Sequence, residues 1–234
     1  VKADDYQKNS EEFLSTPIRR YTSASTEKLS QCCGLTSEKL QTCLFEAAEK
    51  VTLKAIKQNE ECMAITMMTS PRLSQSYSLY SEASTALWVS SQSKKKNMNG
   101  QGQSRCLEFL VAEVDDGGST NEANFGTAYT DASKFKGTRV PHWLKVLLIS
   151  NLLKSYEKIL YVDADATVVH THSSDWLEKL LFENKDFNFV ITRDAEGSKE
   201  LIYNENGAPR LNDATYVNTG ILLFQKNDGL GSEW

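Results

Sequence analysis

The feature that most constrains this chain is a short apolar segment, residues 159–162, followed at once by two carboxylates, Asp163 and Asp165. Such a run is typical of a buried strand in an α/β sheet, where ligands bind just beyond the carboxyl ends of the strands. Carboxylate oxygens suit hard divalent cations, and an ion with open coordination positions can hold a diphosphate. The segment therefore predicts a metal-assisted site for a phosphate-bearing substrate. The alternative is plain turn chemistry, because Asp also favours turns.

Length and charge narrow the class of protein. The 234 residues, 40% of them hydrophobic, can bury one α/β core with a segment left over. The net charge of −5 argues against a nucleic-acid surface, and no stretch approaches the roughly 20 apolar residues of a membrane span. The chain starts at Val1 and ends at Trp234 just after an apolar segment. We therefore expect a piece cut at both ends, with room for a membrane anchor upstream.

The order of apolar segments predicts an α/β domain preceded by a helical extension. In residues 1–60, apolar side chains recur at helical spacing between Leu40 and Ala55, which predicts a helical stem or added subdomain. Residues 61–234 then form the main domain. Alternating strands and helices there predict a mostly parallel, Rossmann-like sheet flanked by helices. The expected strands are 62–70, 107–114, 158–163, 187–192 and 216–224, and the expected helices are 77–89, 142–154 and 174–181.

The five cysteines show no zinc-ligand spacing. Cys32 or Cys33 could form a disulfide with Cys43 in an oxidising compartment. Ordinary buried thiols are the equally simple alternative.

Polar groups interrupt two other apolar segments. Asn218 and Gly220 lie inside an apolar strand, where Gly marks the close approach of a ligand and an amide can bind sugar hydroxyls. A β-bulge is the alternative there. Lys145 is the only charge of its expected helix before Lys154. It either neutralises a phosphate or pairs with an Asp, or else it lies exposed on the outer helix face.

In this order the pieces resemble those of GT-A-type glycosyltransferases. The residues that carry the resemblance are Trp143-Leu-Lys145, the DxD strand 158–165, and the Asn-Thr-Gly strand 217–224. The similarity covers residues 62–234 and is strongest with Golgi galactosyl, mannosyl and xylosyl transferases of the nucleotide-diphospho-sugar transferase superfamily. DxD alone is a weak motif, whereas the three pieces in this order are more specific.

The resemblance implies a GT-A-like catalytic domain in residues 61–234, incomplete at its C-terminus. It implies a Mn²⁺ (or Mg²⁺) ion held by Asp163 and Asp165, bridging the two phosphates of a nucleotide-diphosphate sugar. The substrate-binding residues that it implies are Thr69 and Ser70 near the nucleotide base, Lys145 near the diphosphate, Ala164 within the DxD motif, and Asn218 and Gly220 near the sugar or acceptor.

The implied activity is a retaining transfer of a hexose or pentose from a UDP- or GDP-linked donor to a glycan or glycoprotein. The implied protein is a type II membrane protein of the Golgi or secretory-pathway lumen. A histidine that usually completes the metal site would lie beyond residue 234, so we expect these residues alone to be inactive or poorly stable. Asp194, at the end of its expected strand, is a candidate for binding vicinal sugar hydroxyls, with a turn-forming role as the alternative.

The competing function is a haloacid-dehalogenase-like phosphatase with Asp163 as nucleophile and Asp165 as acid/base. Residues 163–167 match its DxDxT pattern. That fold starts near its DxD, whereas 162 residues precede Asp163, and no acidic pair at a strand end follows in the last 71 residues. A lectin-like or regulatory module without catalysis is a third reading, but it leaves both aspartates unexplained.

Overall fold

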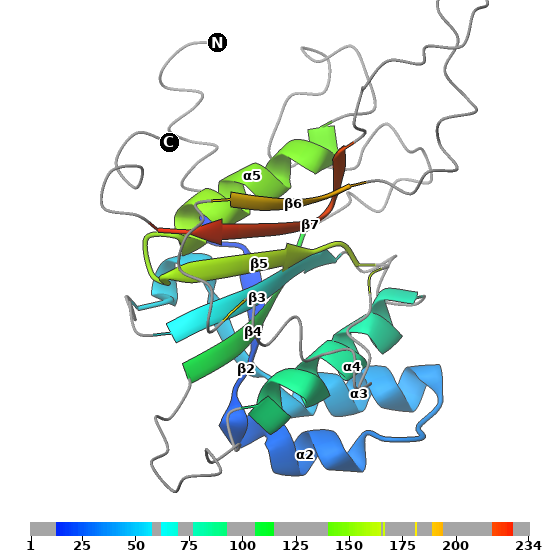
Figure 1. The fold of residues 1–234 in the computed structure, drawn as a ribbon. Helices are drawn as coiled ribbons and strands as arrows, with labels where there is room; N and C mark the ends of the chain where they lie inside the picture. The colour runs from blue at the N-terminus through cyan, green and yellow to red at the C-terminus, as the bar shows by residue number, and fades with distance from the viewer. Residues whose placement is uncertain are drawn as a thin grey trace, which may run out of the picture.

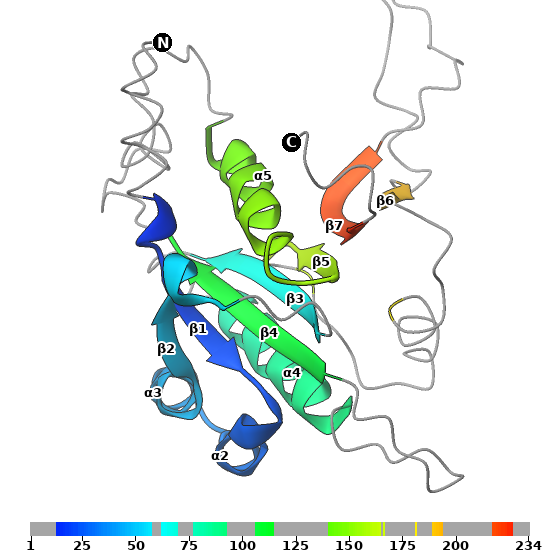
Figure 2. The same ribbon diagram turned by 90° about the vertical axis from the view of Figure 1, so that its left-hand side faces the viewer.

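The computed structural model describes residues 13–57, 62–69, 77–92, 106–114, 140–164, 166, 181, 189–193 and 217–226. They form an α/β fold around one seven-stranded sheet with strand order β2-β1-β4-β3-β5-β7-β6. Helices α2, α3 and α4 lie on one face of the sheet and α5 lies on the other (Figures 1 and 2). The α/β class expected from the sequence is therefore confirmed.

The elements follow the apolar segments of the sequence closely from residue 62 on. The strands are β1 (Pro17–Tyr21), β2 (Glu49–Thr52), β3 (Cys62–Thr69), β4 (Cys106–Glu113), β5 (Lys158–Val162), β6 (Phe189–Arg193) and β7 (Val217–Gln225). The helices are α2 (Thr26–Gln31), α3 (Ser37–Ala47), α4 (Tyr77–Gln92) and α5 (Val140–Leu152), with 3-10 turns η1 (Ser23–Ser25) and η2 (Leu53–Ala55). The helix expected at 174–181 lies outside the described residues except for Leu181.

Strands β3, β4 and β5 are buried on both faces, which explains their nearly unbroken apolar sequence. Successive side chains of a strand point to opposite faces. In β4, Phe109 therefore packs in the cluster that includes Trp88 of α4, whereas Leu110 packs in the cluster that includes Leu148 of α5. The two clusters together form the hydrophobic core, one on each face of the sheet.

The sheet is mixed, so the expectation of a mostly parallel sheet is not confirmed. Among the described strands, β3 pairs in parallel with β4 and with β5, while the other four pairings are antiparallel. Strands β1 and β7 run opposite to β3, β4 and β5, whereas β2 and β6 run in the same direction as these three. An apolar run predicts a buried strand but carries no sign of its direction, because the side-chain period is the same in both cases.

The N-terminal region contributes strands as well as helices. Helix α3 buries Leu40, Leu44 and Ala47, as the helical spacing predicted, but it ends at Ala47. Val51 instead pairs with Ile18 in the antiparallel pair β1–β2, since strand pairing outweighs the weak preference set by local sequence. Strand β1 also pairs with β4, so residues 17–52 extend the sheet formed by the later strands. The division of the chain at residue 60 stays a prediction.

Two consecutive arginines of β1 anchor this edge of the sheet on its two faces. On the α4 face, Arg19 donates to both carboxylate oxygens of Glu82 at 2.8 Å and also pairs with Glu113, and Tyr21 donates to Glu82. Burial alone would lower the pKa of Arg19, but the hydrogen bond and charge of Glu82 outweigh it and raise that pKa. The guanidinium therefore stays charged inside the protein.

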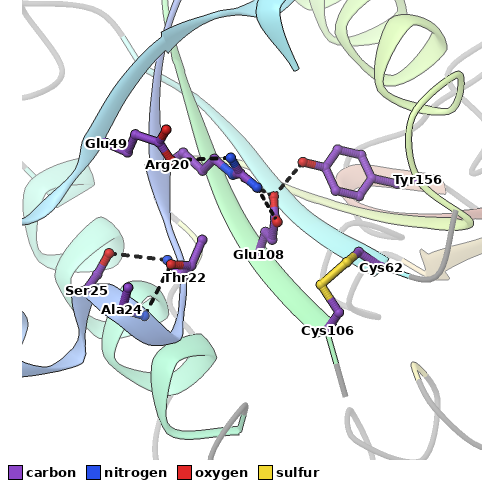
Figure 3. Close-up of polar contacts among 9 residues, drawn as sticks. All are labelled: Arg20, Thr22, Ala24, Ser25, Glu49, Cys62, Cys106, Glu108 and Tyr156. Carbon is purple, nitrogen blue, oxygen red and sulfur yellow. Dashed lines mark hydrogen bonds and ion pairs between the residues drawn. A yellow bond between two sulfur atoms is a disulfide. The ribbon is translucent and has the colours of Figure 1, made fainter. Parts of the chain in front are cut away.

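On the α5 face, Arg20 donates to both oxygens of Glu108 at 2.6 and 2.8 Å, and the Tyr156 hydroxyl donates to the same carboxylate at 2.6 Å (Figure 3). Burial, followed by the charge of Glu108, raises the pKa of Tyr156. Glu108 is itself buried, so its charge is compensated by an arginine and a hydroxyl, as a buried carboxylate requires.

Two disulfides link neighbouring elements. Cys32, at the end of α2, bonds to Cys43 of α3, and Cys62 bonds to Cys106 at the starts of β3 and β4 (Figure 3). The Cys32–Cys43 pairing confirms one of the two partners considered for Cys43, and Cys33 is an exposed free thiol. Cysteines 44 residues apart give no spacing signal, so the second bond was not expected.

No helix in the described part of the chain is long and apolar enough to cross a membrane.

Candidate functional site at the carboxyl edge of the sheet

The order in which the strands are added to the sheet reverses at β3, so the carboxyl end of β3 is a topological switch point of the sheet. From β3 the chain passes through α4 to β4 on one side, and it later returns through α5 to β5 on the other side of β3. The two helices lie on opposite faces (Figure 2). In open α/β sheets this arrangement leaves a crevice outside the carboxyl ends of the two strands, which is where ligands bind.

Several polar residues lie at this carboxyl edge. Thr69, the last residue of β3, is aligned with Glu113, the last residue of β4. Thr66 of β3 is aligned with Tyr161 of β5. Thr69 lies three residues after Thr66, and Asp163 lies two residues after Tyr161, so both residues lie at the carboxyl ends of their strands. The structure therefore places Thr69, Glu113 and Asp163 at the same edge, on three adjacent parallel strands.

Asp163 is held through its backbone on both sides. Its N–H donates to the Gly220 carbonyl at 2.7 Å, and its own carbonyl accepts from the Ala166 N–H at 2.9 Å, which closes a turn. The turn considered from the sequence is therefore present. The side chain nevertheless remains partly exposed, so the turn leaves the carboxylate available to a ligand.

Lys145 reaches Asp163 from α5. Its Nζ lies 3.3 Å from Asp163 Oδ1 and 5.0 Å from the centroid of the Tyr161 ring, and the side chain is buried. Pairing with an Asp, one of the roles expected for Lys145, is confirmed, and the exposed position on the outer helix face is wrong. The buried ammonium fixes one oxygen of the carboxylate, and the other oxygen is available for coordination.

The Asn-Thr-Gly segment of β7 lies beside the end of β5. Because β7 is antiparallel to β5, its first residues run past the carboxyl end of β5, where Gly220 meets Asp163. The pairing of β7 with β6 is irregular at this segment, since Ile191 is aligned with Leu222 but Thr192 with Asn218. This register shift is a β-bulge or a related irregularity of the ladder, and bulges often re-aim side chains beside functional sites. The side chain of Asn218 lies outside the described residues.

The remaining predicted residues divide into two groups. Thr69 is buried, and its hydroxyl lies 3.3 Å from the Ser78 hydroxyl at the start of α4. Ala164 is partly buried against the core cluster on the α4 face. Ser70, Asp165 and Asp194 lie outside the described residues.

The sequence reading missed Glu113. This residue ends the apolar strand β4 and its side chain is 28% exposed, while its partner Arg19 is buried. A carboxylate directly after a buried strand is the same signal that identified Asp163, so the pattern could have found it.

The donor chemistry at the edge suits a hard divalent cation. Asp163 offers a carboxylate oxygen at a partly exposed position, the type of ligand that Mn²⁺ and Mg²⁺ prefer. A different group, Cys62, Cys106 and Glu108, has ligand atoms within 4.8 Å of one another. Its sulfurs are joined in a disulfide and Glu108 is engaged by Arg20 and Tyr156, so this group does not suit such an ion.

No protein-family model, no curated protein and no solved structure matches the chain.

Proposed function

We propose that this protein is a metal-dependent glycosyltransferase of the GT-A type that moves a sugar from a nucleotide-diphosphate donor to a glycan or glycoprotein. One observation carries the proposal. At the switch point of the sheet, the Asp163 carboxylate is held by a buried lysine, and the Asp163 backbone N–H donates to Gly220 of the Asn-Thr-Gly strand. Asp165 follows two residues later in the sequence.

The metal in this proposal is Mn²⁺ or Mg²⁺, held by Asp163 and Asp165. When bound, the ion supplies Lewis-acid stabilisation of the charge that develops on the departing diphosphate. Two carboxylates leave most coordination positions open. Metal and nucleoside diphosphate are therefore expected to bind cooperatively.

The residues around the metal position have their own roles in the proposal. Lys145 keeps the Asp163 carboxylate in one orientation through a contact of 3.3 Å. Its positive charge also favours the approach of a diphosphate. In the proposal, Thr69 binds the nucleoside, and Asn218 and Gly220 bind the sugar. The contact of Gly220 with Asp163 at the end of β5 supports the second assignment.

The cellular setting proposed is the Golgi or secretory-pathway lumen. Two disulfides support it, because such bonds persist in oxidising compartments and are rare in the cytosol. A retaining transfer from a UDP- or GDP-linked sugar is the form of the reaction that the resemblance favours.

Titration calorimetry on the full-length protein tests the proposal. Wild-type protein should bind UDP or GDP about 10-fold or more tightly with Mn²⁺ than without it, and Asp163→Asn and Asp165→Asn should remove that gain. Glu157→Gln is the matched control, because Glu157 lies just before β5 at the opposite end of the same strand and should leave binding unchanged.

Activity assays separate the two enzyme classes. The transferase proposal predicts Mn²⁺-dependent hydrolysis or transfer from a nucleotide sugar, lost in Asp165→Ala. Turnover of a generic phosphate monoester that is lost in Asp163→Asn, without any release of sugar from UDP- or GDP-sugars, would overturn it in favour of the phosphatase.

A further inference from the structure

Glu113 is a carboxylate with one fixed oxygen and one open oxygen. Oε2 is paired with Arg19 Nη1. Within the part of the chain that the structure describes, Oε1 has no hydrogen-bond partner, and the side chain is 28% exposed. A partly exposed acid of this kind can accept hydrogen bonds from a ligand without first changing its position.

Arg19 holds Glu113 rigidly because the arginine is itself fully engaged. Its Nε and Nη2 donate to the two oxygens of Glu82 at 2.8 Å, which leaves Nη1 for Glu113. Both Arg19 and Glu82 are buried. The guanidinium therefore connects α4, β1 and β4, and it sets the orientation of the exposed carboxylate. Such preorganisation lowers the ordering cost of binding a ligand.

Glu113 and Asp163 end the two strands that flank β3. These strands are two strand spacings apart, roughly 10 Å, a span that a nucleoside diphosphate can bridge. Glu113 lies on the α4 face and Asp163 on the α5 face. A ligand laid across the end of β3 at Thr69 would therefore meet Asp163 with its diphosphate and Glu113 with its nucleoside.

The chemistry of the open oxygen indicates which part of the nucleoside it meets. The open oxygen of Glu113 only accepts hydrogen bonds, and its two lone pairs can accept from the two neighbouring hydroxyls of a ribose. In doubly wound folds an acidic residue commonly binds ribose hydroxyls while the phosphates lie at the switch point. Arg19 Nη1 occupies Oε2, which leaves Oε1 as the acceptor that faces a ligand.

We propose that Glu113 binds the 2′ and 3′ hydroxyls of the donor ribose and that Arg19 is its positioning residue. The inference rests on the proposed function, since it assigns the nucleoside half of the same site. Glu113 thereby makes the protein select ribonucleoside diphosphates over other diphosphates.

The experiment measures the binding of three probes to the full-length protein by calorimetry with saturating Mn²⁺. The probes are UDP or GDP, whichever wild type binds, its 2′-deoxy form, and inorganic pyrophosphate. Glu113→Gln should weaken ribonucleotide binding about 10-fold, because the amide keeps an acceptor for Arg19 but loses the open one. It should leave pyrophosphate binding unchanged and should remove most of the preference for ribose over deoxyribose.

The matched control is Glu108→Gln, on the same strand and also clamped by an arginine, but on the α5 face and near the other end of β4. It should lower stability and leave the affinity for all three probes unchanged. Unchanged ribonucleotide affinity in Glu113→Gln, or an equal loss for pyrophosphate, overturns the inference. If wild type binds neither UDP nor GDP with Mn²⁺, the proposed function itself is wrong, so the wild-type measurement separates the two failures.

Discussion

The ammonium of Lys145 and the carboxylate of Asp163 form an asymmetric ion pair. The two groups are 3.3 Å apart, and the lysine side chain is 6% exposed whereas the aspartate side chain is 38% exposed. Water can solvate the anion if it loses its partner, but it can barely reach the cation. The asymmetry determines how each partner behaves when the other is removed.

Asp163→Asn should destabilise the protein more than Lys145→Met. The first change removes the Asp163 charge from beside a buried ammonium, while the second leaves a carboxylate that water can solvate. Because Asp163 is partly exposed, the difference should be modest, about 1 kcal/mol in the free energy of unfolding. Urea titration of both variants measures it, and equal losses would show that the cation is better solvated than its burial indicates.

Lys145→Met should also separate metal binding from nucleotide binding. Without the ammonium, Asp163 no longer has a competing cation, so Mn²⁺ alone should bind several-fold more tightly. UDP or GDP in the presence of Mn²⁺ should bind several-fold more weakly, because one positive charge near the diphosphate is lost. Calorimetry with each ligand gives the two changes. Changes in the same direction would mean that Lys145 acts only by orienting Asp163.

Much of the central fold could be predicted because its signals are local. The runs that became β3, β4, β5 and β7 are apolar over four or more residues, and the intervening helices have apolar spacing. Strand direction could not be predicted, since a buried strand has the same pattern in either direction. For this reason β7 was expected, but not its antiparallel position beside β5.

The candidate site was predicted where one short segment contained the signal, and missed where distant segments had to meet. Asp163 follows its strand directly, and Lys145 interrupts an apolar helix, so both were singled out. Arg19 meets Glu82 and Glu113 across 63 and 94 residues. Nothing in a polar N-terminal segment indicates such partners, and Arg19 comes near them through the pairing of β1 with β4.

The Arg19–Glu82 pair should be important for stability. Glu82→Gln leaves a buried guanidinium with Glu113 as its remaining carboxylate, and such changes cost about 3 kcal/mol or more. Glu49→Gln is the control, because Glu49 pairs with Arg20 at 3.3 Å but is 59% exposed, and its loss should cost less than about 1 kcal/mol. Urea unfolding compares the two. Similar costs would show that burial does not distinguish these pairs.

The two disulfides should contribute unequally to stability. Their half-cystines are 11 and 44 residues apart, and the chain-entropy model gives about 3 and 4 kcal/mol for loops of these lengths. The Cys62→Ser/Cys106→Ser double variant should therefore unfold at lower urea than Cys32→Ser/Cys43→Ser. Maleimide labelling of the unreduced native protein should modify only Cys33 among the described cysteines. Labelling of Cys62 or Cys106 before reduction would contradict the second bond.

The Tyr156–Glu108 contact predicts a loss of stability at high pH. Burial and the charge of Glu108 raise the pKa of Tyr156 in the folded protein, whereas an unfolded tyrosine titrates near pH ~10. The stabilisation is therefore fully present below pH ~10 and is lost as the pH rises towards the folded value, at about 1.4 kcal/mol per pH unit. Tyr156→Phe should lower stability at neutral pH, because the hydrogen bond to Glu108 is lost. Above pH ~10 the free energy of unfolding of this variant should decrease less steeply than that of wild type.

Tyr80→Phe, at a tyrosine that is 53% exposed, controls for the loss of a surface phenol. The comparison covers about pH 9 to 11, the range around the ordinary pKa of tyrosine. If the stability curves of wild type and Tyr156→Phe are parallel there, the pKa of Tyr156 is the same in the folded protein and in the unfolded chain.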